Sequence, residues 1–303
     1  MKQQTIKTES HISGKGIHTG REATVRFVPA QPNSGIIFIR TDLKNAPEIS
    51  ARLENVVDTE RATTLASENV RVRTVEHVLA AVFGLGISNL TIEIDAEELP
   101  IMDGSSKIYY ETLLSSGLEE QSEESRRCVI QKEMSFSNSA DTSWIRIKPC
   151  DEFQITYHLN YADWIKQYYT YTFSPATFFS EIAPARTFSL LSELEHLLKK
   201  GMLTGIKEAA GFALVDDKSK LISFRENFSV DLDKFHHFNG GLSIISKEKL
   251  RFPDEMARHK ILDIIGDFAL SGYYIKGHIE AFGTGHSENI GLMKILFGSD
   301  RSL

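Results

Sequence analysis

The sequence predicts an α+β protein built from two domains. Strand-like and helix-like segments are mixed along the chain but do not alternate strictly, which disfavours a doubly wound parallel sheet. The chain has 303 residues, a length that is typical of two domains. A polar, highly charged segment from Leu118 to Arg127 is the best candidate linker. We therefore expect an N-terminal domain over residues 1–121 and a C-terminal domain over residues 128–303.

Composition excludes several classes of protein. A net charge of −7 and the lack of long Lys/Arg runs argue against a nucleic-acid partner. No apolar stretch approaches the ~18 residues of a membrane span, and the N-terminus lacks the apolar run of a signal peptide. Two cysteines, Cys128 and Cys150, allow one disulfide at most, which fits a reducing compartment. We expect a soluble cytoplasmic protein, and the modest negative charge does not exclude a phosphorylated ligand.

The N-terminal half is predicted to be mostly strands. Three segments alternate in polarity or are rich in β-branched residues, namely Thr24–Val28, Gly35–Arg40 and Leu90–Asp95. Two helices are predicted, over Thr74–Phe83 and Ser106–Ser116. The first repeats apolar residues at helical spacing and is followed by a glycine, and the second lies between serine and glycine end signals.

The C-terminal half repeats this mixture. Strands are predicted over Trp144–Lys148, Phe153–Leu159, Tyr168–Phe173 and Ile275–Phe282. Helices are predicted over Leu190–Lys200, Glu255–Ser271 and Asn289–Phe297. The first of these has a leucine stripe and a Lys-Lys-Gly end, and the second follows Pro253 with Asp254 as the expected N-cap.

The helix predicted over residues 255–271 carries the most informative motif. His259, Asp263 and Asp267 follow one another at intervals of four, so they share one face of the helix. An imidazole and a carboxylate one turn apart can bind the same metal ion. The same spacing also occurs on ordinary solvated faces, and spacing alone leaves both interpretations open.

Glu76 and His77 begin the helix predicted over residues 74–83. Neighbouring helical residues point about 100° apart, so one metal ion would not normally bind both. The useful division is His77 as a ligand and Glu76 as a general base for a metal-activated water molecule. Combined with His259 and Asp263, this gives three ligands and a base, the count of a catalytic zinc site with an open fourth position. Alone, the pair also fits an exposed Glu beside a half-buried His.

Two glycine-rich turns contain histidines. Gly283–Ser287 follows a predicted strand and can present His286 to a pocket as a general acid or phosphate partner. An exposed His in a plain turn is the alternative. Gly14–Gly20 lacks both the glycine spacing and the following helix of a dinucleotide-binding loop, so it is interpreted as a turn from which His18 could face a site.

Together, these motifs resemble the family of UDP-3-O-acyl-N-acetylglucosamine deacetylases, the zinc amidases of lipid A biosynthesis in Gram-negative bacteria. The matching segments are Gly16–Gly20, Thr74–His77, Pro100–Ser105, Ala185–Phe188, Arg258–Asp267 and Gly285–His286. They occur in the family's order and extend over nearly the whole chain. Each segment is a weak signal by itself, and the combination is specific.

The resemblance implies a zinc ion, with Fe²⁺ as an alternative, held by His77, His259 and Asp263. It implies Glu76 as the base that deprotonates the attacking water. The reaction would be hydrolytic removal of acetate from UDP-3-O-acyl-N-acetylglucosamine, the committed step of lipid A biosynthesis.

For the remaining catalytic groups, the resemblance implies that a protonated His286 donates a proton to the leaving amine. Asp267 would orient His286 and hold its charge. Thr187 would donate a hydrogen bond to the developing oxyanion. Contacts with the substrate are implied for Lys260, Phe188, His18, Lys148 and Tyr161.

The family's fold implies two similar α+β domains that face each other, each with a small insert, and an active site between them. The second insert corresponds to residues near 190–215, whose apolar side chains would line a passage for the acyl chain. We expect a monomer.

Two other functions remain as alternatives. A zinc metallopeptidase would use the same chemistry, but the sequence has no H-E-x-x-H motif. A non-catalytic sugar-binding module would hold a structural zinc. Glu76 discriminates between a catalytic and a structural zinc site, because a closed structural site needs no base.

Overall fold

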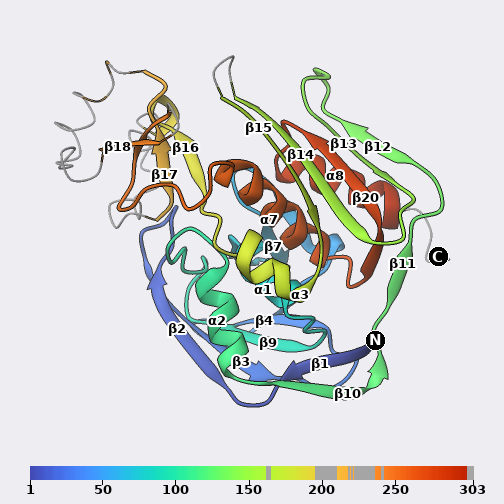
Figure 1. The fold of residues 1–303 in the computed structure, drawn as a ribbon. Helices are drawn as coiled ribbons and strands as arrows, with labels where there is room; N and C mark the ends of the chain where they lie inside the picture. Colours follow the sequence, from blue (N-terminus) through green and yellow to red (C-terminus); the bar gives the residue numbers. More distant parts are fainter. Residues whose placement is uncertain are drawn as a thin grey trace.

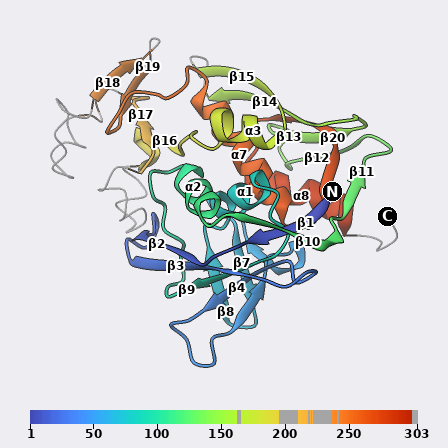
Figure 2. The ribbon, with the colours of Figure 1, turned by 60° about the horizontal axis from the view of Figure 1, so that its bottom comes forward.

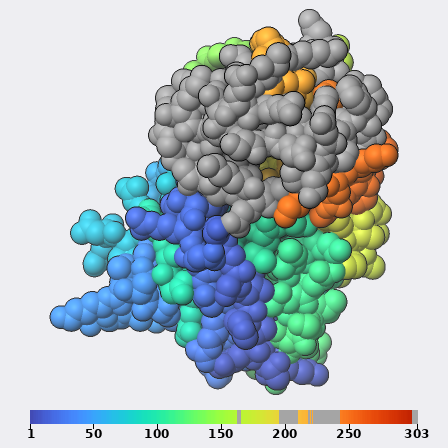
Figure 3. Space-filling view, turned by 90° about the vertical axis from the view of Figure 1, so that its left-hand side faces the viewer, coloured from blue at the N-terminus to red at the C-terminus, as the bar shows by residue number. Residues whose placement is uncertain are grey.

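Two β-sheets face each other across a layer of helices (Figure 1). The computed structural model describes residues 1–161, 165–194, 210–217, 219, 221, 236–239 and 242–298. We call the first sheet with its helices the first lobe and the second sheet with its helices the second lobe. Figure 3 shows the blue and green surface of the first lobe beside the orange surface of the second.

The sheet of the first lobe has the strand order β2-β3-β9-β4-β5. Its strands are β2 (Ser10–Lys15), β3 (Glu22–Pro29), β4 (Ile36–Arg40), β5 (Glu48–Ser50) and β9 (Leu90–Ile94). The central strand β9 is antiparallel to β3 and parallel to β4. Leu90, Ile92 and Ile94 are all buried, so the alternation in the sequence correctly predicts one face against the core.

The sheet of the second lobe repeats this topology, with the order β12-β13-β20-β14-β15. Its strands are β12 (Met134–Ser137), β13 (Trp144–Lys148), β14 (Phe153–Tyr161), β15 (Ile165–Thr172) and β20 (Tyr274–Phe282). Central β20 is antiparallel to β13 and parallel to β14, and β11 (Arg127–Val129) pairs with it in parallel. The expected fold class, two similar α+β layers, is confirmed.

Four helices fill the space between the sheets. They are α1 (Glu76–Gly84), α2 (Lys107–Ser115), α7 (Glu255–Ala269) and α8 (His286–Phe297). Shorter helical turns are η1 (Leu53–Asn55), α3 (Pro175–Thr177) and η2 (Phe178–Ile182). In the described part of the chain all four long helices were predicted, although α8 begins three residues before the expected start. Asp254 precedes α7 without capping it, because its carboxylate pairs with Arg258 at 2.7 Å.

Two smaller sheets extend the lobes (Figure 2). One consists of β6 (Val56–Asp58), β7 (Thr64–Ser67) and β8 (Val70–Arg73). The other consists of β16 (Phe188–Leu190), β17 (Phe212–Leu214), β19 (Leu242–Ile245) and β18 (His236–Asn239). The helix predicted over Leu190–Lys200 is present at residues 191–194, since Leu190 is the last residue of β16, and residues 195–200 lie outside the described residues. Most of the expected acyl passage also lies outside them.

The predicted linker is extended and hydrogen-bonded. Leu118–Glu124 forms β10, which pairs antiparallel with β1 (Lys2–Ile6). Its side chains are largely exposed, so the polar sequence is that of a surface strand. Its backbone groups form hydrogen bonds with a strand from the start of the chain. The predicted domain boundary near residue 122 falls in this strand and stays a prediction.

The lobes share one apolar core. Phe83 at the end of α1 packs against Phe153, Phe173 and Tyr274, with ring centroids 5.1–5.7 Å apart. Burial of several aromatic rings at this contact contributes to holding α1 against the second lobe. Within the described part of the chain, no helix combines the length and apolarity needed to cross a membrane.

Candidate metal centre and active site

The site begins where α1 begins. Glu76 and His77 occupy the first two positions of α1, and each is only 3% exposed. The whole helix is buried, so both polar side chains lie in the interior and need partners there. The N-terminal end of a helix favours negative charge, which suits the Glu76 carboxylate.

The facing helix α7 supplies the other groups. His259, Asp263 and Asp267 lie on one stripe, and each is at most 4% exposed. Gly266, on the same helix, permits an unusually close approach of α1. A Cβ added at Gly266 would lie 2.1 Å from the backbone oxygen of Glu76. A residue without a side chain is therefore required where the two helices touch.

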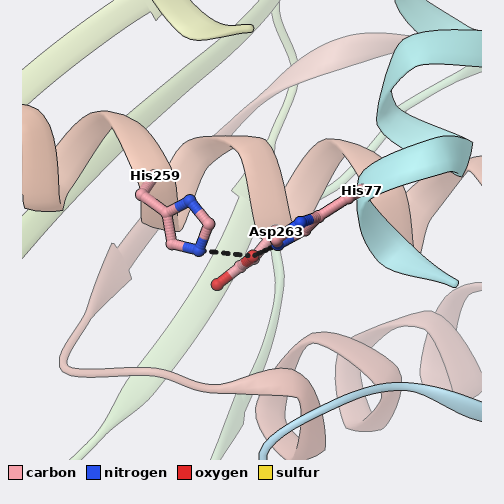
Figure 4. A group of neighbouring side chains, drawn as sticks. All are labelled: His77, His259 and Asp263. Atoms are coloured by element: carbon pink, nitrogen blue, oxygen red, sulfur yellow. Dashed lines mark ion pairs between the residues drawn. The ribbon is translucent and has the colours of Figure 1, made fainter. Parts of the chain in front are cut away.

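Two histidines and one aspartate converge between these helices (Figure 4). The Nε2 atoms of His259 and His77 lie 3.4 and 4.0 Å from Oδ1 of Asp263. One ligand atom from each residue falls within 4.8 Å of the other two, and this was the one such cluster found among the described residues. Ligands ~2.1 Å from a tetrahedral metal are about 3.4 Å apart, so the spacing fits a metal ion.

The surroundings orient these ligands. Nδ1 of His259 lies 3.1 Å from the backbone oxygen of Ala185, so a neutral ring donates there and leaves Nε2 free. Burial lowers the pKa of His77 to about 3, and His259 adds to the effect. Burial also lowers the pKa of His259. Both rings are therefore neutral at pH 7, the form that binds metal.

Asp263 is ionised. Burial alone would raise its pKa, but the neighbouring His259, Lys260 and His286 hold it well below the usual range. The Lys260 ammonium lies 3.1 Å from Oδ2 of Asp263, and Asp263 in turn keeps the pKa of Lys260 raised against the opposing effect of burial. Two neutral imidazoles and a carboxylate are a donor set that suits a divalent transition metal.

A second group of hydrogen bonds lies beside this cluster. His286, the first residue of α8, places Nδ1 2.8 Å from Oδ2 of Asp267 and Nε2 3.9 Å from Oε1 of Glu76. The second carboxylate oxygen of Glu76 accepts the backbone N–H of Thr63 at 3.0 Å. Asp267 also accepts bonds from the Thr63 hydroxyl at 2.6 Å and from the Asn289 amide at 2.8 Å. All five residues are at most 7% exposed.

The pKa values of Glu76 and His286 are shifted in a way that suits proton transfer. Burial raises the pKa of Glu76 to about 7, helped by the nearby Asp263 charge. Burial alone would lower the pKa of His286, but Asp267 outweighs it and raises this pKa to about 10. At neutral pH His286 is therefore a cation, and Glu76 can accept a proton.

Thr187 lies on a loop that both lobes hold. Its backbone N–H donates to the Gly104 oxygen at 2.7 Å, and its own oxygen accepts from Phe212 at 3.1 Å. The preceding residue, Arg186, forms a buried ion pair with Glu255 at 2.8 Å, one turn before His259 on α7. These contacts fix the loop in the region of the metal cluster.

Three of the predicted substrate contacts lie together beside His259. The Phe188 ring centroid is 6.3 Å from that of His259 and 5.8 Å from that of Tyr161. The Lys260 ammonium lies 5.8 Å from the Phe188 ring centroid, which places a cation next to an apolar face. The resemblance thus grouped Tyr161 with Phe188 and Lys260, which lie 27 and 99 positions later in the sequence.

The other two predicted contacts lie elsewhere. Lys148 shares the solvent-facing side of β13 with Arg146, opposite the buried Ile145 and Ile147, and its ammonium is 2.5 Å from Glu280. His18 is buried in the first lobe, where its backbone N–H donates to Glu98 at 2.9 Å. The described contacts of Lys148 are thus on the exposed face of β13, because a strand presents alternate residues to opposite faces.

Sequence patterns missed Thr63 and Asn289. Thr63 precedes β7 in a segment with no predicted element, and its acceptor Asp267 is 204 positions away. Asn289 lies one turn after His286, and the expected start of the last helix at that residue concealed this relation. Of the two missed residues, only Asn289 could have been recognised from the sequence, because it lies at helical spacing from His286.

Comparison with known proteins gives concordant matches. The family model of UDP-3-O-acyl N-acetylglycosamine deacetylase matches residues 3–229 and 238–298. The bifunctional enzyme LpxC/FabZ of Chlorobaculum tepidum is 38% identical over 299 residues, covering 97% of this chain, and the chain spans 64% of its length. The UDP-3-O-acyl-N-acetylglucosamine deacetylase of Thermodesulfovibrio yellowstonii is 38% identical over 296 residues, covering 97% of this chain and 91% of that protein. The deacetylase of the same name in Chlamydia abortus is 36% identical, with coverages of 96% and 95%.

Proposed function

The chain belongs to the UDP-3-O-acyl N-acetylglycosamine deacetylase family, and we propose that the cluster between α1 and α7 is the active site for that family's reaction. The protein is a hydrolytic enzyme that removes the acetyl group from UDP-3-O-acyl-N-acetylglucosamine in lipid A biosynthesis. One observation supports this location above all. The metal-binding cluster lies directly beside a base and an acid, with Glu76 and His286 3.9 Å apart.

Members of this family are metalloenzymes, and the described residues provide a group that could hold a metal ion. We propose zinc as that metal, held by His77, His259 and Asp263, with Fe²⁺ as the alternative that the same ligands accept. When bound, the metal would lower the pKa of a water molecule and polarise the acetamide carbonyl. The neutral histidines and ionised Asp263 need lose no proton to bind it.

Glu76 is the general base of the proposed mechanism. Its Oε2 atom is engaged by the Thr63 N–H, so Oε1 is the oxygen that accepts a proton from the attacking water. A pKa of about 7 in the metal-free protein gives a carboxylate that is basic enough to take this proton near neutral pH.

His286 is the general acid. Asp267 binds Nδ1 and stabilises the imidazolium, while Nε2 faces Glu76 and is free to donate a proton to the leaving amine. The positive ring also stabilises the negative charge that develops on the carbonyl oxygen. Thr187 is proposed to donate a hydrogen bond to that same oxygen, from a loop that Gly104 and Phe212 hold in place.

Substrate binding is proposed to involve Lys260, Phe188 and Tyr161, which line the space beside His259. Phe188 and Tyr161 provide apolar ring faces, and the Lys260 ammonium can pair with an anionic part of the nucleotide sugar. His18 and Lys148 remain proposed contacts that would need a substrate extending well beyond the cluster.

We also propose that the enzyme works as a monomer in the cytoplasm. Every side chain assigned above comes from a single chain, so no second copy is required to complete the site. Both cysteines are unpaired thiols, as expected in a reducing compartment. Size-exclusion chromatography with light scattering tests the monomer, and a stable dimer would contradict it.

A structural zinc in a sugar-binding module is the rival function. Structural zinc sites have four protein ligands, whereas this cluster offers three and has Glu76 next to it. A metallopeptidase is the other rival, and cleavage of peptides in place of the nucleotide sugar would favour it.

The deciding experiment measures deacetylation of UDP-3-O-acyl-N-acetylglucosamine by the purified protein. We expect activity to disappear with a chelator and to return with added zinc. Glu76→Gln should lower kcat by about 10²- to 10⁴-fold while metal content is kept. Glu111→Gln, at an exposed glutamate of α2, is the matched control and should retain full activity. Full activity of Glu76→Gln would refute the assigned base.

A further inference from the structure

Thr63 is the one residue that donates hydrogen bonds to two of the proposed catalytic and orienting groups, counted over the described residues. It lies in the first lobe between β6 and β7 and is completely buried. Its backbone N–H donates to Oε2 of Glu76 at 3.0 Å. Its hydroxyl donates to Oδ1 of Asp267 in the second lobe at 2.6 Å. One residue thus connects the base of one lobe to the carboxylate that orients the acid of the other.

The bond to Glu76 distinguishes its two oxygens. Oε2 is occupied by a backbone donor, and the carboxylate cannot rotate without losing that bond. Oε1 is thereby directed toward His286, whose Nε2 is 3.9 Å away. Without this contact, a carboxylate can present either oxygen, and its orientation relative to the metal ligands is not fixed.

The bond to Asp267 has the same effect on the acid. Oδ1 accepts from Thr63, while Oδ2 accepts from His286 and Asn289, both at 2.8 Å. Asp267 therefore has donors on both oxygens, and the plane of its carboxylate is fixed from both lobes. The His286 ring, bonded to Oδ2, takes its orientation from that plane.

We propose that Thr63 is a positioning residue that sets the relative placement of the Glu76 base and the Asp267–His286 pair. The inference rests on the proposed function, since it assumes these roles for Glu76 and His286. A hydroxyl is the essential group, because the backbone N–H of any residue at this position can serve Glu76, but only a side-chain donor can reach Asp267. Hydrogen bonds to charged groups are among the stronger ones in proteins, so its loss should be measurable.

The adjacent residue provides a matched control. Thr64 is 1% exposed, and its hydroxyl has no hydrogen-bond partner in the described part of the chain. Thr63→Val and Thr64→Val make the same chemical change at neighbouring buried positions. A role limited to packing would make the two variants alike.

The test compares steady-state kinetics of Thr63→Val, Thr63→Ser and Thr64→Val with the metal-loaded wild type. We expect Thr63→Val to lower kcat by about 10- to 100-fold with KM nearly unchanged and metal content retained. Thr63→Ser keeps the donor and should restore kcat to within about threefold. Thr64→Val should match the wild type, because a hydroxyl without an acceptor contributes little.

A double-mutant cycle tests whether Thr63 affects kcat through its hydrogen bond to Asp267. In an Asp267→Asn background, Thr63→Val should change kcat much less than it does in the wild type, since the two residues act through one bond. If Thr63→Val is too unstable to purify, Thr63→Ala compared with Thr63→Ser answers the same question. Wild-type kcat in Thr63→Val or Thr63→Ala, an equal loss in Thr64→Val, or a purely additive cycle would each overturn the inference.

Glu76→Gln separates this inference from the function on which it rests. If Glu76→Gln is fully active, the proposed site is wrong and the role of Thr63 falls with it. If Glu76→Gln is inactive while Thr63→Val has normal kcat, the site stands and only the positioning role is refuted.

Discussion

The two lobes share one topology but divide the chemistry unequally. In each sheet the central strand is antiparallel to one neighbour and parallel to the other, and a helix precedes that strand while another follows it. By this order α1 corresponds to α7, and α2 corresponds to α8. The first helix pair meets at the metal cluster. Of the second pair, α8 begins with the proposed acid His286, whereas α2 begins with Lys107, outside the site.

The two lobes therefore repeat one topology, but they contribute different residues to a single site. The first lobe provides Glu76, His77 and Thr63, and the second provides two of the three proposed metal ligands and the Asp267–His286 pair. Neither lobe alone holds enough ligands for a tight metal site. The site therefore depends on the contact between corresponding helices, and variants can test each side of that contact.

The largest effect is expected from removing one metal ligand in either lobe. His77→Ala in the first lobe and His259→Ala in the second should both lose tightly bound metal, with affinity lower by more than about 100-fold. Metal content after dialysis, measured by mass spectrometry, checks this. His11→Ala, at an exposed histidine of β2, should keep its metal. Retention of one metal ion per chain in either ligand variant would contradict a site shared between the lobes.

The second prediction compares the loss of stability when an ion pair within one lobe is broken with the loss when an ion pair between the lobes is broken. Glu255→Ala removes the buried carboxylate that pairs with Arg186 and leaves that buried charge only the longer contact with exposed Glu248 at 3.8 Å, so we expect a loss of about 3–5 kcal/mol in the free energy of unfolding. Arg251→Ala breaks a partly exposed pair with Asp103 across the lobes, at 2.8 Å, and should cost about 1 kcal/mol or less. Chemical denaturation measures both. Equal losses would show that exposure does not decide the outcome.

The third effect concerns the helix contact itself. Gly266→Ala would force a Cβ against the Glu76 backbone, so we expect about 1–3 kcal/mol of destabilisation together with a fall in kcat. Gly84→Ala is the matched control, because its Cβ would meet the Phe178 ring, which is not part of the site. It should lower the melting temperature without changing kcat once folded. A Gly266→Ala enzyme with normal kcat would show that close packing of α1 and α7 is not needed for catalysis.

The smallest effect is a pH dependence that arises mainly from the His286–Asp267 pair of the second lobe. Asp267 raises the pKa of His286 to about 10 in the metal-free protein, above its ordinary value of 6.5. The stability from this pair is fully present below pH 6.5 and is lost as pH rises through about 10. Between pH 7 and 10.5, the unfolding free energy of the metal-free wild type should fall more than that of His286→Gln, by on the order of 1 kcal/mol. Denaturation curves in a chelator test this, and parallel changes in the two proteins would contradict it.

Helical spacing explains how much of this could be predicted from the sequence. The helices that became α1 and α7 were correctly placed, because their apolar residues repeat at helical intervals. His259 and Asp263 were recognised because their relation is local. Their meeting with His77 is not local. The ligand count of a catalytic zinc site suggested the combination, and the resemblance to a known family then implied it directly.

The missed features share a different cause. The strand β10 was taken for a linker because its partner β1 lies over 100 residues earlier and its own side chains are polar. His286 was placed in a turn, whereas it starts α8, because the Glu288 carboxylate accepts the Gly285 N–H at 3.0 Å and stabilises an earlier helix start. Thr63 gave no signal at all, since a threonine becomes informative only when its acceptors are known.

The chain passes from the first lobe to the second at a single place, between β10 and β11. The proposed metal ligands on either side of that crossing are therefore joined covalently by one short segment and otherwise by noncovalent contacts, among them the Thr63–Asp267 hydrogen bond and the Arg251–Asp103 ion pair. Such a segment acts as a tether, so the two incomplete half-sites meet within one molecule and not by collision of separate molecules. Metal binding would then be an intramolecular association of the two half-sites. We expect a change that weakens the connection between β10 and β11 to lower the affinity for metal, even though no ligand is altered.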